Sequence, residues 1–206
     1  MPSTKHNPQL KGQRKIYFGK KRKGTAMRKF TLFIVVLMAA LLAAGQSWAA
    51  EVGTAQYYLD QGKEHFKGGN LDQAITDYNK ALELNPNLAS AYNNLGAIFV
   101  QKDQFDRAMT AYNKAIELDP KQAQFYNNRG GAYRELNHYD EAIADFNRAL
   151  ELNPNYANAY YNRAVAFYQK KAFDRAWDDV KKTQSLGGNI NPEFLEGLRK
   201  ASGREK

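Results

Sequence analysis

A period of 34 residues is the feature of this sequence that most constrains its fold. Four windows of this length follow one another without a gap, at 55–88, 89–122, 123–156 and 157–190. Tyrosine stands at position 4 of every window and alanine at position 20, while position 8 is glycine three times and then Ala164. Apolar residues recur at spacings of three and four, as in amphipathic helices. Each window therefore predicts two helices that approach closely where their side chains are small.

The second helix of a window is predicted to end at an Asn-Pro or Asp-Pro pair. Position 32 is Pro86, Pro120 and Pro154 in the first three windows, and the residue before a proline disfavours helical backbone angles. Polar turns such as Lys67–Asn70 ("KGGN") and Gln101–Gln104 ("QKDQ") separate the two helices. A helix pair cannot bury its apolar stripe alone, so successive pairs are expected to stack.

This pattern closely resembles the tetratricopeptide repeat (TPR), a helix–turn–helix unit, over 136 of the 206 residues. The resemblance implies an all-α fold, a right-handed α-solenoid of four helix-turn-helix units. After the fourth window, 191–201 predicts a capping helix, because Asn191 can cap its start and Pro192 suits its first turn. Residues 202–206 are expected to be a disordered tail.

The N-terminal region reads as an export signal. Residues 27–49 ("MRKFTLFIVVLMAALLAAGQSWA") combine two cations, an apolar run and small residues at Ser47 and Ala49, which predicts a signal peptide cleaved after Ala49. The alternative is a membrane anchor at 30–50, a segment without charge that is just long enough to span a bilayer. The body is accordingly predicted to be periplasmic or secreted, or else anchored to the inner membrane facing the periplasm.

Residues 1–26 form a basic extension in front of this signal. If translation starts at Met27 the extension is not part of the protein; if it starts at Met1 the extension is expected to be disordered. Residues 1–29 hold ten Lys and Arg and no acid, whereas residues 30–206 hold 20 basic and 21 acidic side chains. The mature body is therefore near neutral, and we expect it to bind no nucleic acid.

No arrangement in the sequence predicts catalysis, a cofactor or a metal. There is no cysteine, and the three histidines, His6, His65 and His138, fall in unrelated places. "FKGGN" at 66–70 lacks the Gly-Lys-Ser/Thr ending of a phosphate-binding loop and follows a helix. The chain is predicted not to be an enzyme.

The face of each first helix that points away from its packing stripe is the candidate binding surface. It holds positions 2, 5, 6, 9, 12 and 13 at 100° per residue. The resemblance implies that this face lines a concave groove that holds peptides or helices of partners. The predicted binding residues are Lys63, Asn93, Asn94, Asn127, Asn128, Arg134, Tyr161, Asn162 and Tyr168, and the rest of the lining is Leu59, Asp60, Phe66, Ala97 and Gly131.

Asparagine amides offer both a donor and an acceptor, so they match a peptide backbone of any sequence. Arg134 can take a carboxylate, and the tyrosines add contact area. For the position-6 asparagines, Asn94, Asn128 and Asn162, two roles stay open: binding a ligand, or bonding to the backbone of the next repeat. The position-5 asparagines are expected to favour binding.

Two further features of the first helices follow from the resemblance and from charge. Family members that clamp a C-terminal carboxylate need cations at set positions, and neither in-phase trio of repeats carries them, so such a clamp is not predicted. Arg129 and Arg163 stand at position 7 where an apolar residue is usual. Their stems are expected to pack while their guanidinium groups reach a neighbouring acid.

These observations predict a non-enzymatic protein-interaction scaffold of the bacterial cell envelope, whose groove binds a peptide or helix of a partner. One alternative is an inner-membrane-anchored subunit of an envelope assembly or secretion complex, with membrane contact through 30–50 only. Another is an accessory protein of an enzyme or an array that self-associates into homo-oligomers. The identity of the partner cannot be read from the chain.

Overall fold

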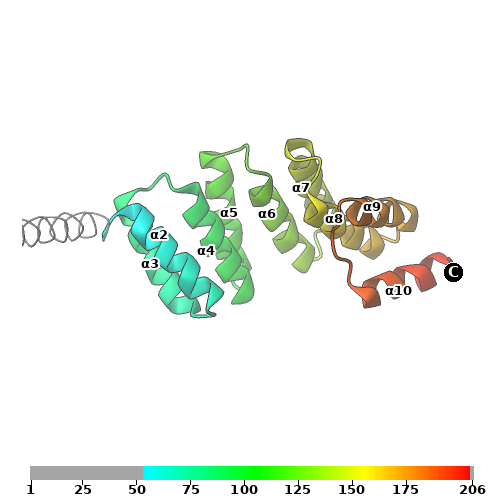
Figure 1. Cartoon of the computed structure of the whole chain (residues 1–206), viewed down its shortest axis with the longest axis horizontal. Helices are drawn as coiled ribbons and strands as arrows, with labels where there is room; N and C mark the ends of the chain where they lie inside the picture. Colours follow the sequence, from blue (N-terminus) through cyan, green and yellow to red (C-terminus); the bar gives the residue numbers. More distant parts are fainter. Residues whose placement is uncertain (1–52, 205–206) are drawn as a thin grey trace, which may run out of the picture. The chain divides into compact units, whose positions relative to one another are not determined.

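The computed structural model describes residues 53–204, and within this part of the chain there are nine helices and no strand. The predicted extension (1–26), signal peptide (27–49) and alternative anchor (30–50) lie outside the described residues. The helices pack as antiparallel pairs that follow one another in chain order (Figure 1). Their bounds are α2 Ala55–Lys67, α3 Leu71–Leu84, α4 Ala89–Gln101, α5 Phe105–Leu118, α6 Ala123–Glu135, α7 Tyr139–Leu152, α8 Ala157–Gln169, α9 Phe173–Ser185 and α10 Pro192–Ser202.

The helix pairs follow the 34-residue period. The first helix of each pair begins at Ala55, Ala89, Ala123 or Ala157, the first residue of a window. The predicted all-α solenoid of four helix-turn-helix units is confirmed. In the description below, repeats 1 to 4 are the pairs α2–α3, α4–α5, α6–α7 and α8–α9.

Small residues set the contact between the two helices of a pair. A Cβ added to Gly62 or Gly96 would lie 2.6 Å from the ring of Tyr78 or Tyr112 at position 24 of the same repeat. The alanines at position 20 are fully buried in all four repeats. Repeat 4 carries Ala164 at position 8, where position 24 is the smaller Val180. The larger residue at position 8 is therefore matched by a smaller residue at position 24 of the same contact.

The turn inside each repeat needs one residue in the left-handed backbone region. That residue stands at position 15, where Gly69 has φ 77°, Asp103 56°, Asn137 60° and Lys171 59°. Glycine, asparagine and aspartate tolerate this conformation best, while lysine is strained there. The repeats thus share one turn geometry despite four different residues.

Helix α10 closes the C-terminal end of the array as the capping helix was expected to do. The Asn191 side-chain oxygen accepts hydrogen bonds from the Glu193 and Phe194 N–H groups at 2.7 and 3.4 Å. Leu198 is fully buried, and Phe194 and Leu195 pack beside it against repeat 4. The helix therefore takes the place that a further repeat would fill.

The expectation of a disordered tail at 202–206 is wrong for residues 202–204. Ser202 is the last residue of α10, and the indole N–H of Trp177 donates to its hydroxyl at 3.0 Å. The guanidinium of Arg204 donates to Asp174 at 2.8 Å. These side-chain contacts hold the chain against α9 beyond the last turn of the helix.

Among residues 53–204, no helix is both long enough and apolar enough to cross a membrane.

Candidate functional site

A continuous chain of side-chain hydrogen bonds runs across the first helices of repeats 2, 3 and 4. Each asparagine accepts at its side-chain oxygen from the residue before, and each except the last, Asn94, donates from its Nδ2 to the next oxygen. In order, Arg134 donates to Asn162 (3.3 Å), Asn162 to Asn127 (3.0 Å), Asn127 to Asn128 (3.4 Å), Asn128 to Asn93 (3.0 Å) and Asn93 to Asn94 (3.4 Å). This set is called the amide chain below.

The position-5 asparagines lie inside the array, not on its free face. Asn93 is 3% exposed and Asn127 is 8% exposed. The expectation that position 5 points away from the packing is therefore wrong. The reason is inter-repeat geometry: adjacent first helices stack so closely that the position-6 asparagine of one repeat covers the position-5 residue of the repeat before. A helical wheel drawn for one helix cannot contain that contact.

The position-6 asparagines are half-buried and partly engaged. Asn128 and Asn162 each donate to a position-5 side chain of the preceding repeat, so the bond runs to a side chain and not to the backbone. Asn94 has no such acceptor, because Leu59 stands at position 5 of repeat 1. These residues tie repeats together, and their role toward a ligand stays a prediction.

Two clefts lie beside one part of the amide chain, the part made by Asn127, Asn128, Arg134 and Asn162; Asn93 and Asn94 line neither cleft. One, of about 280 Å³, is lined by residues of α4, α6 and α8 that include Ala97, Asn128 and Gly131. The other, of about 450 Å³, lies between α6 and α8 and includes Tyr161 and Gln169. Arg134, Glu135 and Asn162 line both clefts. The two clefts are therefore neighbouring parts of one groove, called the amide groove below.

The floor of the amide groove is open at Gly131. A Cβ added there would meet nothing within 4 Å, in contrast to Gly130, where it would lie 2.8 Å from the ring of Phe146. The two adjacent glycines of α6 thus do different work. Gly130 admits the second helix of its own repeat, while Gly131 leaves space toward the groove.

Arg134 is held at the junction of the two clefts by its own helix and the next. One guanidinium nitrogen donates to Asn162, and another forms an ion pair with Glu135 at 2.8 Å. Its side chain is 24% exposed. A carboxylate of a ligand would have to replace or share the contact with Glu135.

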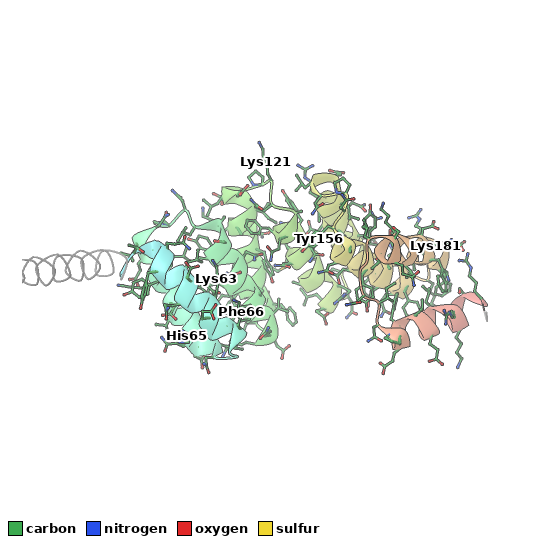
Figure 2. The ribbon with its side chains drawn as sticks, in the orientation of Figure 1. Lys63, His65, Phe66, Lys121, Tyr156 and Lys181 are labelled. Atoms are coloured by element: carbon green, nitrogen blue, oxygen red, sulfur yellow. The ribbon has the colours of Figure 1, made fainter. Side chains whose placement is uncertain are left out.

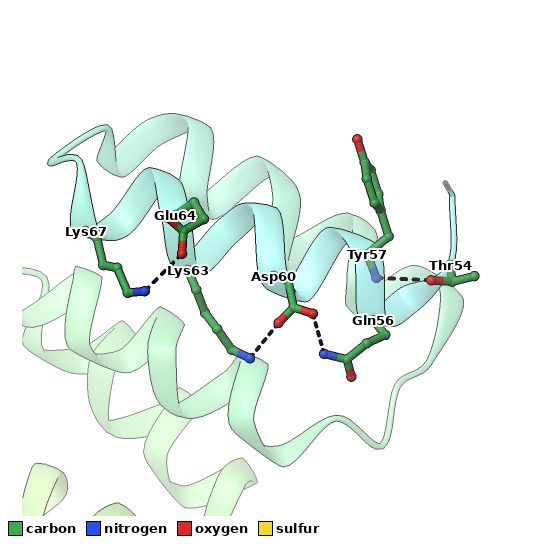
Figure 3. A network of polar contacts seen from close by, with 7 residues as sticks. All are labelled: Thr54, Gln56, Tyr57, Asp60, Lys63, Glu64 and Lys67. Carbon is green, nitrogen blue, oxygen red and sulfur yellow. Dashed lines mark hydrogen bonds and ion pairs between the residues drawn. The ribbon is translucent and has the colours of Figure 1, made fainter. Parts of the chain in front are cut away.

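The remaining predicted residues lie toward the two ends of the row of first helices. Lys63 forms an ion pair with Asp60 at 2.7 Å on the exposed face of α2, next to the pair of Lys67 and Glu64 (Figure 3). The hydrogen bond from Gln56 and the pair with Lys63 lower the pKa of the Asp60 carboxyl. Lys63 and Phe66 stand on the same helix (Figure 2), and neither lines the amide groove.

The capping helix α10 packs against the rings of Tyr161 and Tyr168. The ring of Phe194 makes edge-to-face contacts with both, at 5.6 Å between centroids. Tyr161 still lines the groove beside Asn162, but Tyr168 lines neither cleft. Tyr168 therefore lies partly against α10 and outside the amide groove, and its role toward a partner stays a prediction.

A second polar network lies at position 7, on the side of the first helices that packs against α7 and α9. Arg129 makes two hydrogen bonds of 2.7 Å to the carboxylate of Asp145 and a third to Asn113. Arg163 does the same with Asp179 and Asn147. The prediction that these arginines reach a neighbouring acid is confirmed.

The carboxylates of this second network are almost buried. Burial raises the pKa of Asp179 above its ordinary value, and the two hydrogen bonds from Arg163 oppose that rise. The bonds to Asp145 raise the pKa of Arg129, so this guanidinium stays charged. In repeat 1 the place of the arginine is taken differently: the imidazole of His65 lies 2.6 Å from the Asp77 carboxylate.

No set of three His, Asp or Glu residues comes together as a metal site within residues 53–204. His138, in the turn of repeat 3, stacks on the ring of Tyr133. Neither His65 nor His138 lines the amide groove.

Comparison with known families decides the class of this array. A family model described as TPR repeat matches residues 62–103, 97–133 and 130–171, which together span more than half of the chain. The chain belongs to the TPR family. The consecutive matches run through repeats 1 to 4, so the TPR pattern and the helix pairs coincide.

Two solved structures and one curated relative resemble it at moderate identity. A structure of pilF from Pseudomonas aeruginosa has a TM-score of 0.66 and 27% identity, covering 73% of this chain and 68% of that one. The first TPR domain of Spaghetti (RPAP3), bound to the HSP90 peptide SRMEEVD, has a TM-score of 0.54 and 26% identity, covering 57% and 97%. The rice (Oryza sativa subsp. japonica) protein SGT1 homolog is 38% identical over 60 residues, 29% of this chain and 16% of the rice protein. The match thus spans a small part of that relative.

The inter-repeat pairing inside this TPR array had a signal in the sequence. The bonds join residues 35 apart, Asn93 with Asn128 and Asn127 with Asn162. A search for polar pairs at one period plus one residue would have found both. It would also have found that Leu59 breaks the series at repeat 1.

Proposed function

We propose that this TPR protein binds an extended segment of a partner protein in the amide groove. The single observation that carries the proposal is that the side-chain amides of Asn127, Asn128 and Asn162, from two consecutive first helices, line a groove whose floor is open at Gly131. A groove built from equivalent positions of successive repeats suits a ligand that also repeats along its length, such as a peptide backbone.

The amide chain retains hydrogen-bonding capacity for such a ligand. Each side-chain amide has two N–H donors and an oxygen with two lone pairs, and the chain uses one donor and one lone pair at most positions. Asn128 and Asn162, which line the groove, each keep one N–H donor after the bond to the preceding repeat. The backbone of a partner can therefore add to the chain without breaking the bonds between repeats.

The likeness to the peptide-bound Spaghetti domain supports this class of partner. The amide groove differs from a carboxylate clamp. Among the described residues that line it, Arg134 is the one cation, and it already forms an ion pair with Glu135. Recognition here rests on neutral amides instead of a row of cations. We therefore expect selectivity for backbone shape and for small side chains over Gly131, more than for a terminal carboxylate.

The setting we propose is the bacterial cell envelope, where the array acts as a scaffold without chemistry of its own. The support is the signal at 27–49 in the sequence. Expression of the full chain in a Gram-negative host, followed by fractionation and N-terminal mass analysis, tests this. We expect periplasmic protein that begins at Ala50. Protein that stays in the membrane after a carbonate wash would favour the anchor at 30–50, and cytoplasmic protein would overturn export.

Selection of peptides from a random dodecapeptide library against the full chain, followed by affinity measurements on two matched variants, tests the groove. Gly131→Trp fills the open floor, and removing a helix glycine does not weaken α6. Lys181→Trp places the same bulk on α9, at a side chain that is 70% exposed and lies outside the groove (Figure 2). We expect the first variant to lose binding by about tenfold or more and the second to keep it. Equal affinity for both variants would overturn the groove as the site.

A further inference from the structure

The second polar network is missing from repeat 2, and a cleft lies in its place. In repeats 3 and 4 the arginine at position 7 bonds the aspartate at position 23. In repeat 2 these positions are Leu95 and Ala111. Both members of the ion pair are thus replaced together by apolar residues.

The surroundings of the missing pair are still present in repeat 2. In repeat 4 the guanidinium of Arg163 lies between the rings at positions 4 and 11, 5.5 Å from Tyr160 and 5.7 Å from Phe167. In repeat 2 the same two positions hold Tyr92 and Phe99. The two rings remain, but position 7 supplies no guanidinium between them.

The amide that would receive the arginine also remains. The position-25 asparagine of the preceding repeat accepts from the arginine in both later repeats: Asn113 from Arg129 and Asn147 from Arg163, at 2.7 and 2.6 Å. The equivalent residue before repeat 2 is Asn79 on α3. Its side chain is exposed and makes no hydrogen bond to the described residues.

The result is a cleft of about 750 Å³ whose floor and walls are Tyr92, Leu95, Phe99 and Ala111, with Asn79 at its rim. Charged residues around it are already balanced. The guanidinium of Arg107 lies 4.0 Å from the centre of the Phe99 ring, and Lys114 forms an ion pair with Glu117 at 2.8 Å. None of its lining residues lines the amide groove.

We propose that this repeat-2 cleft binds a partner peptide through one apolar side chain of leucine or phenylalanine size, with the adjacent peptide group hydrogen-bonded to Asn79. An apolar group fits better than a cation, because Ala111 removes the carboxylate that neutralises the arginine in the later repeats, and a cation buried without that partner is strongly disfavoured. The four charged residues of the lining, Asp106, Arg107, Lys114 and Glu117, balance one another. The cleft is thus an anchor site for a second segment, separate from the amide groove.

Blocked amino acids provide the probe. We would titrate N-acetyl-leucine N-methylamide, the phenylalanine and arginine analogues, and N-acetyl-glycine N-methylamide into protein purified from expression of the full chain, at millimolar concentrations. The readout is ¹H–¹⁵N spectra. We expect saturable shifts at the Asn79 side-chain amide and at Thr110 and Ala111 with the leucine and phenylalanine compounds only. Preference for the arginine compound, or no saturable shift with any compound, would overturn the proposal.

Two double variants test whether the missing ion pair is what creates the cleft. Leu95→Arg with Ala111→Asp gives repeat 2 the pair of repeats 3 and 4, so it should fill the cleft with a solution that this fold already uses. Arg163→Leu with Asp179→Ala should open an equivalent cleft in repeat 4, beside Asn147. In the first variant we expect the leucine compound to cause no saturable shift at repeat 2. In the second variant we expect it to shift the side-chain amide resonance of Asn147.

A third variant keeps the test independent of folding. Asn79→Ala removes an exposed side chain that has no partner, so the fold should be unaffected while binding weakens several-fold. Unchanged binding of the leucine compound in both Asn79→Ala and Leu95→Arg/Ala111→Asp would overturn the assignment of the site.

Discussion

The two halves of this array solve the same packing problem with different chemistry. Repeats 3 and 4 hold an arginine between two aromatic rings and bond it to a nearly buried aspartate and to an asparagine of the preceding repeat. Repeat 2 packs Leu95 against Ala111 at the same positions, and repeats 1 and 2 place a tyrosine at position 24, where repeat 3 has Phe146 and repeat 4 has Val180.

The difference shows which parts of the repeat the fold requires. Small residues at positions 8 and 20 and a left-handed residue at position 15 occur in both halves, so they belong to the helix pair itself. The charged network and the buried phenol occur in only some repeats, so the helix pair does not require them. Where such a variable feature is missing, the surface of a repeat differs from that of its neighbours, as the cleft of repeat 2 shows.

The largest expected effect comes from breaking the charged network on one side. Asp145→Ala leaves the Arg129 guanidinium buried without its carboxylate, and should lower the free energy of unfolding by about 3 kcal/mol. The matched control, Arg129→Leu with Asp145→Ala, copies repeat 2 and should lie within about 1 kcal/mol of the native protein. Urea unfolding followed by circular dichroism measures both. Equal losses in the two variants would mean that the halves do not differ as described.

The amide chain joins the two halves, and Asn93 is the residue on the N-terminal side of that joint. Asn93→Ala removes a buried side chain that accepts from Asn128 and donates to Asn94, so it should cost about 2 kcal/mol of stability. Asn94→Ala breaks only the last bond, from a half-buried residue, and should cost about 0.5 kcal/mol. A loss from Asn94→Ala as large as that from Asn93→Ala would contradict the larger contribution assigned to the buried Asn93 with its two hydrogen bonds.

Position 24 allows the halves to be exchanged. The hydroxyl of Tyr78 is buried and has no hydrogen-bond partner among the described residues, so Tyr78→Phe should stabilise the protein by about 1 kcal/mol. Phe146→Tyr, the reverse change in repeat 3, should destabilise it by a similar amount. Thermal unfolding of the two variants at neutral pH measures the pair, and the same sign for both would contradict the comparison.

The same phenol gives a pH dependence. Burial raises the pKa of Tyr78 to about 12; the Asn94 side chain lies near enough to oppose that rise but makes no hydrogen bond to the hydroxyl. Between pH 10 and about 12 the unfolded phenol ionises while the folded one does not, so the unfolded state binds fewer protons and stability falls as pH rises. Tyr78→Phe lacks this contribution. Its advantage over the native protein should therefore grow from pH 10 to pH 12, as measured by urea unfolding across that range.

The smallest effect concerns a feature that the halves share. Lys171→Gly relieves the left-handed backbone of the repeat-4 turn, and Gly69 already stands at the same position in repeat 1. We expect a gain of about 0.5 kcal/mol. Gly69→Lys is the matched reverse change and should lose a similar amount.

The period was enough to predict the helix pairs and their turns. The capping helix and the ion pairs of Arg129 and Arg163 were predicted from the chemistry of single side chains at known positions. The burial of Asn93 and Asn127 was missed because it arises between repeats. The contact of Tyr168 with α10 was missed for a similar reason, since the position of α10 could not be derived from the register of α8. The cleft of repeat 2 was missed because it results from two substitutions that are unremarkable when taken singly.

These contacts also change how the amide groove should be tested. Replacing Asn94, Asn128 and Asn162 together would remove two bonds between repeats, so a loss of binding could reflect a loss of stability. Gly131 has no such second role, since nothing lies within 4 Å of an added Cβ.

The most direct measurement of the central claim is therefore made on the native protein. With a peptide selected from the library, the side-chain amide resonances of Asn128 and Asn162, which line the amide groove, can be followed in ¹H–¹⁵N spectra during a titration. We predict that both shift together and saturate at the dissociation constant measured by calorimetry. Saturation of binding with these two amides unmoved, while resonances elsewhere on the array shift, would contradict the assignment of the amide groove as the binding site.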